Sequence, residues 1–429
     1  MSATPANRRL AVFIHLNDQS VPAGLLDMTE ARTEVLASSF RYGLLYLDRP
    51  NAIEIDPIGL SIKNKADIRG KALMPPEGLT LFGGIRDAAP DAWGRRVIES
   101  RLHAPLNSLP ESTYLLKAGS QRVGALDIRE SLNSQPTDHR NSIHRLEYLM
   151  EAADRIEQGL PIPAQLEDIF DAGSSLGGMR PKAAIEDDDG VLWLAKFPSH
   201  GERMNVPCIE AATMRLAAEA KLNVPTVKTE VLRGKTVMMI RRFDRETING
   251  HQHRRHMLSA LTMLGCNEAA SPKKSYWDIA DVIRARAAES LVRNNNRELF
   301  ARMVFNILVT NDDDHLRNHA FLWNPQEKGW GLSPLYDVMP RPLLATERFL
   351  HLGVGEQGRL ATLDNALSGY SRFGITLHDA REIIDRVWSV VREWRTHFEN
   401  YGAGEEIEDI APAFRHIDDV LKGAVRSNR

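Results

Sequence analysis

Three residues near the middle of the second half of the chain follow an order that suits phosphate chemistry. Asp313 comes first, Asn318 stands at the fifth position after it, and Asp337 follows within Leu335-Tyr336-Asp337. Transfer of a phosphoryl group to a hydroxyl needs a carboxylate that accepts the proton of the hydroxyl. An amide oxygen and a second carboxylate can hold Mg²⁺ against the phosphates. The pattern therefore predicts a phosphoryl-transfer site, and it requires a fold that brings the three residues together.

The flanking segments predict how that happens. Residues 305–310 form an apolar run that would anchor the loop before Asp313. Residues 320–323 and 330–332 predict two short strands, and the polar segment 324–329 predicts the turn between them. This hairpin would carry Asp337 back toward Asn318. Protein kinases place a catalytic aspartate, an asparagine and a metal-binding aspartate in the same order.

Two other interpretations of this stretch stay open at this point. Acidic clusters such as 311–314 are commonly solvated loops or helix caps. His315 and His319 are four positions apart and could share a helix face as zinc ligands, but the zinc motif of that spacing needs a glutamate where Leu316 stands.

Composition limits the function classes. With 429 residues, 43% of them hydrophobic and 26% charged, the chain suits a globular protein of roughly two to three domains. A net charge of −3 gives no bulk signal for nucleic-acid binding, so DNA would be reached only through a partner. Cys208 and Cys266 are far apart and fit no metal or redox spacing. We expect a cytoplasmic protein without a membrane span.

The order of elements predicts strands first and helices later. Strands are expected over 10–16, 21–26 and 40–47, followed by helices over 85–102 and 142–157 with a polar linker at 131–139 between them. A glycine-rich loop at 173–178 then precedes strands over 183–185, 192–197, 226–232 and 236–240, interrupted by a helix over 207–221, and the rest is mostly helical. This order predicts an α+β protein with two lobes of the protein-kinase type.

The glycine-rich loop is followed by two lysines. Small residues over 174–178 would let backbone N–H groups approach phosphates closely. Lys182 closes the loop, and Lys196 lies in an apolar strand where burial is costly without a partner. Glu210 on the following helix is the candidate partner for an ion pair with Lys196. The alternative is that Lys196 points outward from a half-exposed strand.

Three further motifs suggest other interpretations. Residues 173–177 match the Gly-x-Ser-x-Gly turn of serine hydrolases, but the repeated strand–helix units of that fold are absent. Gly234-Lys235-Thr236 resembles the end of a P-loop, but Thr229 stands where the motif requires glycine. The histidine- and arginine-rich run from His251 to His256 predicts a solvated basic loop.

With these pieces in order, the chain resembles the HipA family, the serine/threonine-kinase toxins of bacterial type II toxin–antitoxin modules. The resemblance covers nearly the whole chain and is carried by segments 174–182, 194–198, 222–225, 240–245, 313–318 and 332–338. It implies a two-lobed, kinase-like α+β fold divided into an N-terminal domain with a small antiparallel sheet at 1–140, a kinase-type N-lobe at 141–255 and a helical C-lobe at 256–429. Tyr336-Asp337-Val338 replaces the Asp-Phe-Gly of ordinary protein kinases, and no Ala-Pro-Glu follows, which puts regulation by an activation-loop phosphosite in doubt.

The resemblance also implies residue roles. Asp313 would be the catalytic base, Asn318 and Asp337 the Mg²⁺ ligands, and Glu210 the ion-pair partner of Lys196. Arg241 to Phe243 would form a hinge that reads adenine, and Ser175 or the adjacent Ser174 would be autophosphorylated. ATP contacts are implied at Ser175, Leu176, Gly177, Gly178, Lys182, Lys196, Arg241, Phe243, His315 and Tyr336.

The implied activity is transfer of the ATP γ-phosphate to a cytoplasmic protein, an aminoacyl-tRNA synthetase where the family's target is known. The implied partner is a HipB-like DNA-binding antitoxin, through which the protein would meet DNA indirectly. The alternative is a kinase-shaped binding module that acts by holding an antitoxin–DNA complex.

Overall fold

The computed structural model describes residues 4–137, 142–174, 178–342, 345, 347–415 and 417. The chain forms two compact units. Unit 1 comprises 1–201, 239–258 and 265–267, and unit 2 comprises 202–238, 259–264 and 268–429. The division expected from the sequence, at 140 and 255, stays a prediction.

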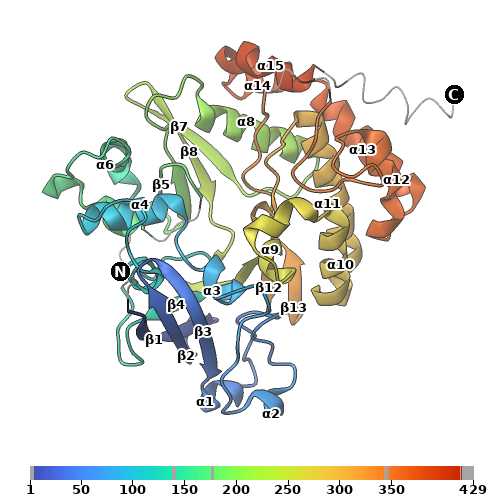
Figure 1. Ribbon diagram of the computed structural model, residues 1–429. Helices are drawn as coiled ribbons and strands as arrows, with labels where there is room; N and C mark the ends of the chain where they lie inside the picture. The colour runs from blue at the N-terminus through green and yellow to red at the C-terminus, as the bar shows by residue number, and fades with distance from the viewer. Residues whose placement is uncertain are drawn as a thin grey trace. The chain divides into compact units, whose positions relative to one another are not determined.

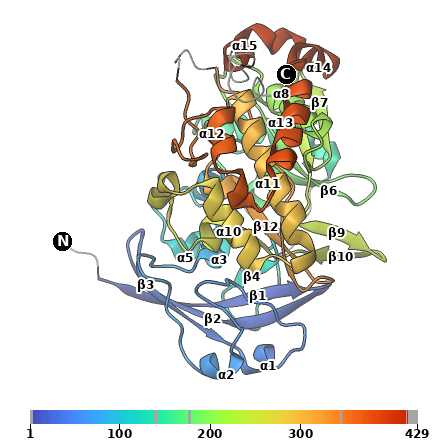
Figure 2. The same cartoon turned by 90° about the vertical axis from the view of Figure 1, so that its right-hand side faces the viewer.

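Unit 1 begins with an antiparallel sheet in the strand order β3-β2-β1-β4 (Figure 1). Figure 2 shows its long strands running across the view, with the short helices α1 and α2 on one side of them. The pairing passes from Val12–Gly24 to Phe13–Pro22, so the extra residue, Ala23, marks a bulge in β2 beside Pro22, which has no N–H to offer the ladder. The strands are β1 (Ala6–Leu16), β2 (Gln19–Ala31), β3 (Glu34–Tyr42) and β4 (Leu126–Arg129).

The helices of unit 1 correct two sequence predictions. The strand expected over 40–47 ends at Tyr42, and the chain turns into α1, where the Tyr46 hydroxyl bonds to the carbonyl of Ile53. The helix expected over 85–102 is two helices, because Pro90 cannot continue one. The helix expected over 142–157 is confirmed as η1 and α6. The helices are α1 (Leu44–Leu47), α2 (Lys65–Ile68), α3 (Gly83–Asp87), α4 (Ala92–Arg101), α5 (Glu111–Lys117), η1 (Ile143–Arg145), α6 (Leu146–Glu157), η2 (Ala164–Leu166) and α7 (Asp168–Gly173).

A second four-stranded sheet has the order β5-β6-β8-β7, and a β-hairpin of β9 and β10 follows it in the chain. Asp187 shapes the turn between β5 and β6, since its carboxylate accepts hydrogen bonds from the Val191 N–H and the Trp193 indole. The strands are β5 (Lys182–Glu186), β6 (Leu192–Lys196), β7 (Val227–Leu232), β8 (Lys235–Arg241), β9 (Arg245–Ile248), β10 (His251–Arg254) and β11 (Met257–Ser259).

Unit 2 is mainly helical, as predicted, and its central helix is α11 (Glu289–Val309). Every residue of α11 from Leu299 to Val309 is buried, which is typical of a helix enclosed on all sides. Its polar members are paired: the Arg302 guanidinium donates to Glu298 and to the carbonyl of Ser333. The predicted hairpin is confirmed as β12 (Ala320–Asn324) and β13 (Gly329–Leu332), which pair in an antiparallel register.

The other helices of unit 2 either pack around α11 or lie farther from it. Two of them begin with a capping box, in which an N-cap hydroxyl and an aspartate three positions later satisfy each other's backbone N–H groups. They are α8 (Val206–Glu219), α9 (Ala260–Met263), η3 (Glu268–Lys273), α10 (Tyr276–Arg286), η4 (Leu316–Asn318), α12 (Leu363–Ser368), η5 (Tyr370–Phe373), α13 (Leu377–Val391), α14 (Trp394–Asn400), η6 (Gly404–Glu406) and α15 (Ile407–Phe414).

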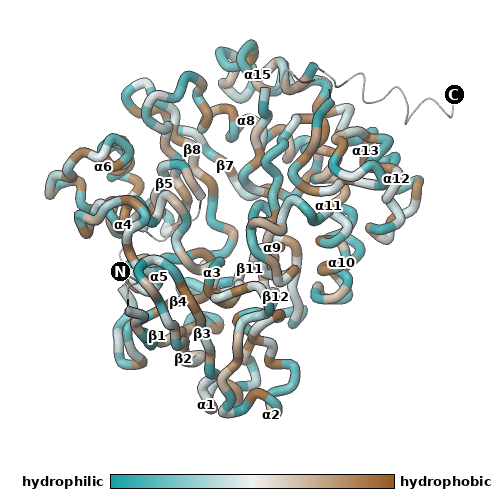
Figure 3. The backbone as a smooth tube through the Cα atoms, in the orientation of Figure 1, coloured by the Kyte–Doolittle hydropathy of each residue, from teal (hydrophilic) through white to brown (hydrophobic). Residues whose placement is uncertain are grey.

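Hydrophobic residues are interleaved with polar ones along most of the backbone (Figure 3). Among the described residues, no helix combines the length and the hydropathy that crossing a bilayer would require.

Candidate active site

The loop that carries Asp313 starts where α11 ends. Thr310 terminates the helix in the left-handed region, with φ 56° and ψ 48°. This conformation is strained for a β-branched residue and needs support from its surroundings. The Thr310 hydroxyl donates to the carbonyl of Ala413 and accepts a hydrogen bond from Arg348, and the Thr310 carbonyl accepts one from the N–H of Arg341 at 3.1 Å. These contacts fix the direction in which the loop leaves the helix.

The buried side of the loop is a polar network centred on Asp314. The Asp314 carboxylate accepts hydrogen bonds from the Tyr276 hydroxyl and, at 3.0 Å, from His319 Nε2. Asn306 donates to the Tyr276 hydroxyl at 3.1 Å and accepts at the same distance from Asn311. Burial would raise the pKa of Asp314, but His319 and Tyr276 outweigh it and hold the pKa below its usual value. Asp314 is therefore ionised and stabilises the loop through these hydrogen bonds, one of which comes from His319.

Asp313 faces the opposite way and is exposed. Its side chain contacts Arg341, with 2.5 Å between Arg341 Nη2 and Asp313 Oδ2. Its backbone carbonyl accepts hydrogen bonds from the His315 N–H at 2.8 Å and from Asn318 Nδ2 at 3.0 Å. The bond from Asn318 orients that amide so that Oδ1 accepts no hydrogen bond from any described residue. The loop thus carries an exposed carboxylate at Asp313 and, five positions later, the amide of buried Asn318.

The hairpin returns the chain to this loop, as the sequence predicted. The Tyr336 hydroxyl donates to the carbonyl of Arg317 at 2.6 Å, so the residue before Asp337 is bonded to the residue before Asn318. Asp337 is exposed and adopts φ 57°, a left-handed conformation that aspartate tolerates better than most residues. The bond between Tyr336 and Arg317 links the two segments that carry the candidate metal ligands, and a shared metal site for Asn318 and Asp337 stays a prediction.

The donor set suits Mg²⁺ in its chemistry. Asn318 and Asp337 offer hard oxygen ligands, and Mg²⁺ in phosphoryl-transfer sites is held by one or two carboxylates together with phosphates and water. Within the described part of the chain, no group of three or more histidine, cysteine, aspartate and glutamate side chains could form a closed metal cage. The residues fit a metal that arrives with a phosphorylated ligand.

Unit 1 carries the predicted phosphate loop, of which Ser175, Leu176 and Gly177 lie outside the described residues. Gly178 adopts φ +91°, its N–H donates to Asp91 Oδ2 at 2.8 Å, and its carbonyl accepts from the N–H of Trp93 at 3.1 Å. The Trp93 indole also donates to the carbonyl of Lys182 at 2.8 Å. The loop is therefore fastened to the first residues of α4. Asp91 and Trp93 were not predicted as residues of this site, although both stand just after Pro90 in the sequence.

Lys182 and Lys196 lie directly opposite each other on β5 and β6. Both side chains are buried, so the outward-pointing alternative for Lys196 is wrong. Their register places both side chains on the same face of the sheet. Glu210 is buried as well, and its pairing with Lys196 stays a prediction.

The predicted hinge at Arg241 to Phe243 ends β8 and is held by buried charges. Arg242 donates from its N–H to Leu192 at 2.9 Å and from its side chain to Asp244 at 2.8 and 3.0 Å. Arg245 adds a bond to Asp244 at 2.8 Å. Burial opposes ionisation of Asp244, but the two guanidinium groups outweigh it and hold its pKa far below the usual value. Because the Arg242 N–H is used within the sheet, adenine recognition would fall to the backbone of Arg241 and Phe243.

The run from His251 to His256 is not a solvated loop, contrary to the sequence interpretation. Residues 251–254 form β10, and Arg254 and His256 are buried. His256 Nε2 lies 2.9 Å from the carbonyl of Ile55, and Arg254 donates to the carbonyl of Ser120. Contacts from residues far away in the sequence bury this stretch, and its composition alone could not show that.

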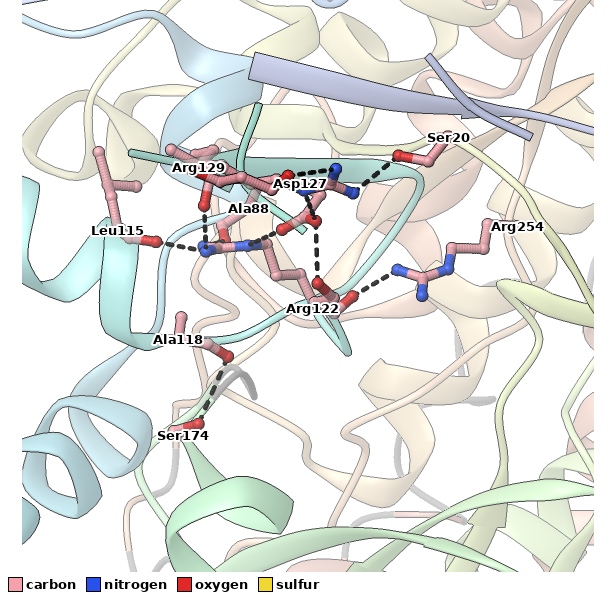
Figure 4. Close-up of polar contacts among 12 residues, drawn as sticks. Ser20, Ala88, Leu115, Ala118, Arg122, Asp127, Arg129, Ser174 and Arg254 are labelled. Carbon is pink, nitrogen blue, oxygen red and sulfur yellow. Dashed lines mark hydrogen bonds and ion pairs between the residues drawn. The ribbon is translucent and has the colours of Figure 1, made fainter. Parts of the chain in front are cut away.

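Arg254 belongs to a cluster of buried charges near Ser174, the residue at which the phosphate loop begins (Figure 4). Fully buried Arg122 donates to the carbonyls of Ala88, Leu115 and Ile128. Asp127 accepts from Arg129 at 2.7 Å and from the Ser120 hydroxyl at 2.9 Å. Ser174 is 3% exposed and donates to the carbonyl of Ala118 at 3.4 Å. A pocket of about 250 Å³ opens here, with Arg101, Lys117 and Ser174 in its wall.

Known proteins resemble this chain in sequence and in fold. The model of the HipA-like C-terminal domain matches residues 174–394, just over half of the chain. The Sinorhizobium fredii protein "Putative kinase Y4mE" is 26% identical over 357 residues, which cover 76% of this chain and 77% of that protein. A Haemophilus influenzae "Putative kinase" is 28% identical over 42% of this chain and 57% of its own length.

The "Serine/threonine-protein kinase toxin HipA" of Shewanella oneidensis is 27% identical over 44% of this chain, and the match spans only 48% of that protein. A solved structure from the same organism, titled as the toxin–antitoxin system HipA, HipB and operator DNA complex, superimposes with a TM-score of 0.67 at 16% identity, covering 96% of both chains. This likeness confirms the predicted α+β fold, with antiparallel sheets toward the N-terminus and a helical C-terminal part. The extent of the domain match, together with this fold, shows that the chain belongs to the HipA family.

Proposed function

We propose that this protein is an ATP- and Mg²⁺-dependent serine/threonine protein kinase that acts as the toxin of a toxin–antitoxin module. The observation that carries the proposal is the arrangement of the loop in unit 2. Asp313 is exposed, and Asn318 is bonded to the Asp313 carbonyl at 3.0 Å. Tyr336, the residue before Asp337, is bonded through its hydroxyl to the carbonyl of Arg317, the residue before Asn318. Buried Asp314, which accepts hydrogen bonds from His319 and Tyr276, would stabilise the loop.

Asp313 would accept the proton of the attacking serine or threonine hydroxyl, since its carboxylate is exposed and next to the metal ligands. Asn318 Oδ1 and the Asp337 carboxylate would hold Mg²⁺, which when bound supplies positive charge that neutralises the phosphate oxygens. His315 and Tyr336 would line the nucleotide site from the same loop and hairpin.

The phosphates would be held by unit 1 residues. Lys182 and Lys196 provide two ammonium groups on one face of the sheet, and the loop over 175–178 would provide backbone N–H groups. Arg241 and Phe243 would contact adenine through the backbone, and Glu210 would pair with Lys196. The proposal for these residues is supported by burial of both lysines and by the bonds that fasten Gly178.

Regulation would follow the family resemblance. Ser175 is proposed as the autophosphorylation site. The burial of Ser174 makes it the poorer acceptor unless the loop leaves its position. A phosphate in this loop would repel the phosphates of ATP.

The Shewanella structure contains HipA with HipB and operator DNA, which supports a HipB-like antitoxin as partner and DNA contact through that antitoxin. The substrate would be a cytoplasmic protein.

The test is phosphate transfer by the purified chain, measured as release of ADP and as added mass on protein, with and without Mg²⁺. We expect activity that requires Mg²⁺ and falls ~10²–10⁴-fold in Asp313→Asn, the usual contribution of a general base. Asp281→Asn is the matched control, because Asp281 is an exposed aspartate of unit 2 in a surface ion pair. ATP binding without any transfer in the wild type would instead favour the binding-module alternative.

A further inference from the structure

Arg341 contacts the carboxylates of Asp312 and Asp313. Its Nη2 lies 2.5 Å from Asp313 Oδ2, and its Nε lies 3.3 Å from Asp312 Oδ1. Asp312 and Asp313 are adjacent in sequence, so one guanidinium bridges two neighbouring negative charges. A planar guanidinium is well suited to such a two-point contact.

The backbone of Arg341 is restrained by its neighbours. Arg341 stands between Pro340 and Pro342, whose rings restrict the backbone on both sides. The N–H of Arg341 donates to the carbonyl of Thr310 at 3.1 Å, and Thr310 is the residue that sets the direction of the loop. The arginine and the catalytic loop are therefore fixed to the same point at the end of α11.

The guanidinium has hydrogen-bonding capacity that these contacts do not use. Arginine carries five N–H donors, and the two carboxylates engage only Nη2 and Nε. Within the described part of the chain, Arg341 Nη1 makes no hydrogen bond or ion pair. The side chain is 46% exposed, so Nη1 can reach a ligand without any rearrangement of the core.

We propose that Arg341 binds the phosphoryl group that is being transferred, and that Asp312 and Asp313 position it for this contact. The inference rests on the proposed kinase function. The substrate hydroxyl oxygen forms a bond to the γ-phosphorus while its proton passes to the Asp313 carboxylate. The bond from the γ-phosphorus to the bridging oxygen breaks, and ADP leaves with that electron pair. Arg341 Nη1 donates to a non-bridging γ-oxygen, where negative charge must be stabilised.

A nearby arginine does not offer the same possibility. Arg317 donates to Glu268 from both Nε and Nη2, and its side chain is 26% exposed. Arg341 differs because its carboxylate partners are the candidate catalytic base and the neighbour of that base. This position also allows an opposite role, in which Arg341 blocks the base, and the experiment separates the two.

The experiment compares Arg341→Gln with wild type and with Arg372→Gln, an exposed arginine of unit 2 that forms a surface ion pair. We measure kcat, the KM for ATP, thermal unfolding, and the affinities for Mg²⁺·ADP and for a non-hydrolysable ATP analogue. We expect kcat to fall ~10²–10³-fold, as for loss of one donor at a developing charge. Affinity for the ATP analogue should fall while affinity for ADP stays within about twofold, because the contact is made only to the γ-group.

Asp312→Asn tests the positioning part of the proposal. Its effect on kcat should be smaller than that of Arg341→Gln, and the double variant should be no slower than Arg341→Gln alone, because both act through one guanidinium. A kcat that is unchanged or raised in Arg341→Gln, in a wild type that transfers phosphate, would overturn the inference and leave the kinase proposal standing. Equal loss of affinity for ADP and for the ATP analogue would reduce Arg341 to a structural role. If wild type transfers no phosphate, the kinase proposal fails first.

Discussion

Lys182 and Lys196 are cross-strand neighbours in register on β5 and β6, and both are buried. Their register places both ammonium groups on the same face of the sheet, which is the face that we propose binds the phosphates of ATP.

We expect Lys196→Met to reduce the affinity for ATP while the fold is retained. The substitution keeps much of the buried volume of the lysine stem but removes the ammonium group that would meet the phosphates. The measurement is the rise in unfolding temperature caused by Mg²⁺·ATP, which follows affinity. Lys228→Met, in the more exposed strand β7, is the control. An ATP-induced rise equal to that of wild type would exclude Lys196 as a phosphate ligand.

Gly178→Ala should weaken ATP binding more than it weakens the fold. A Cβ at this position would stand 2.3 Å from Lys182 Nζ, so the ammonium group would have to move away from its present place. The backbone at φ +91° also disfavours any side chain. Gly201→Ala is the matched control, because Gly201 also has a positive φ, +74°, but has nothing within 4 Å of the added Cβ. Similar losses of ATP affinity in both variants would show that backbone strain alone is responsible.

Asp337→Asn should weaken the binding of Mg²⁺·ATP but leave metal-free nucleotide binding nearly unchanged. The substitution preserves shape and removes the carboxylate charge that Mg²⁺ prefers. Calorimetric titration with ATP, with and without Mg²⁺, measures the difference. Should the Mg²⁺-dependent gain in affinity survive intact in this variant, another residue must hold the metal.

Acidification should destabilise the protein through His256. Burial lowers the pKa of His256 to about 4, although its hydrogen bond to Ile55 acts in the opposite direction. The unfolded chain takes up a proton near pH 6.5, whereas the folded chain resists it down to about pH 4. The contribution of His256 to the free energy of unfolding is therefore complete above pH 6.5. It is lost as the pH falls from 6.5 to about 4, at about 1.4 kcal/mol per pH unit.

Unfolding temperatures between pH 7 and pH 4.5 test this prediction in wild type and in His256→Gln. The variant is expected to be less stable at pH 7 but to lose less stability on acidification. His378→Gln, at an exposed position of α13, is the control and should follow the wild-type pH dependence. Parallel pH profiles for wild type and His256→Gln would contradict the assignment of this effect to His256.

The candidate catalytic loop could be predicted from the sequence because its signals are local. The spacing of Asp313, Asn318 and Asp337, and the turn between two short apolar strands, describe a loop and a hairpin whose geometry is set by neighbouring residues. The Tyr336–Arg317 hydrogen bond then brings the ends of these two local structures together, as the pattern required. The boundary errors near Tyr42 and Pro90 arose where a strand or helix pattern continued past the residue at which the backbone turned.

Other features depended on residues distant in sequence, and only the tertiary structure decided them. Asp91 fastens Gly178 from the start of another helix, and a carbonyl at Ile55 receives the imidazole of His256. The sequence itself established the residue types and the hydrophobic periodicity of each helix or strand, because these depend on the covalent chain and on neighbouring side chains. Which charges are buried, and which carboxylate receives Arg341, depends on free energies of desolvation and pairing that exist only once the chain has folded.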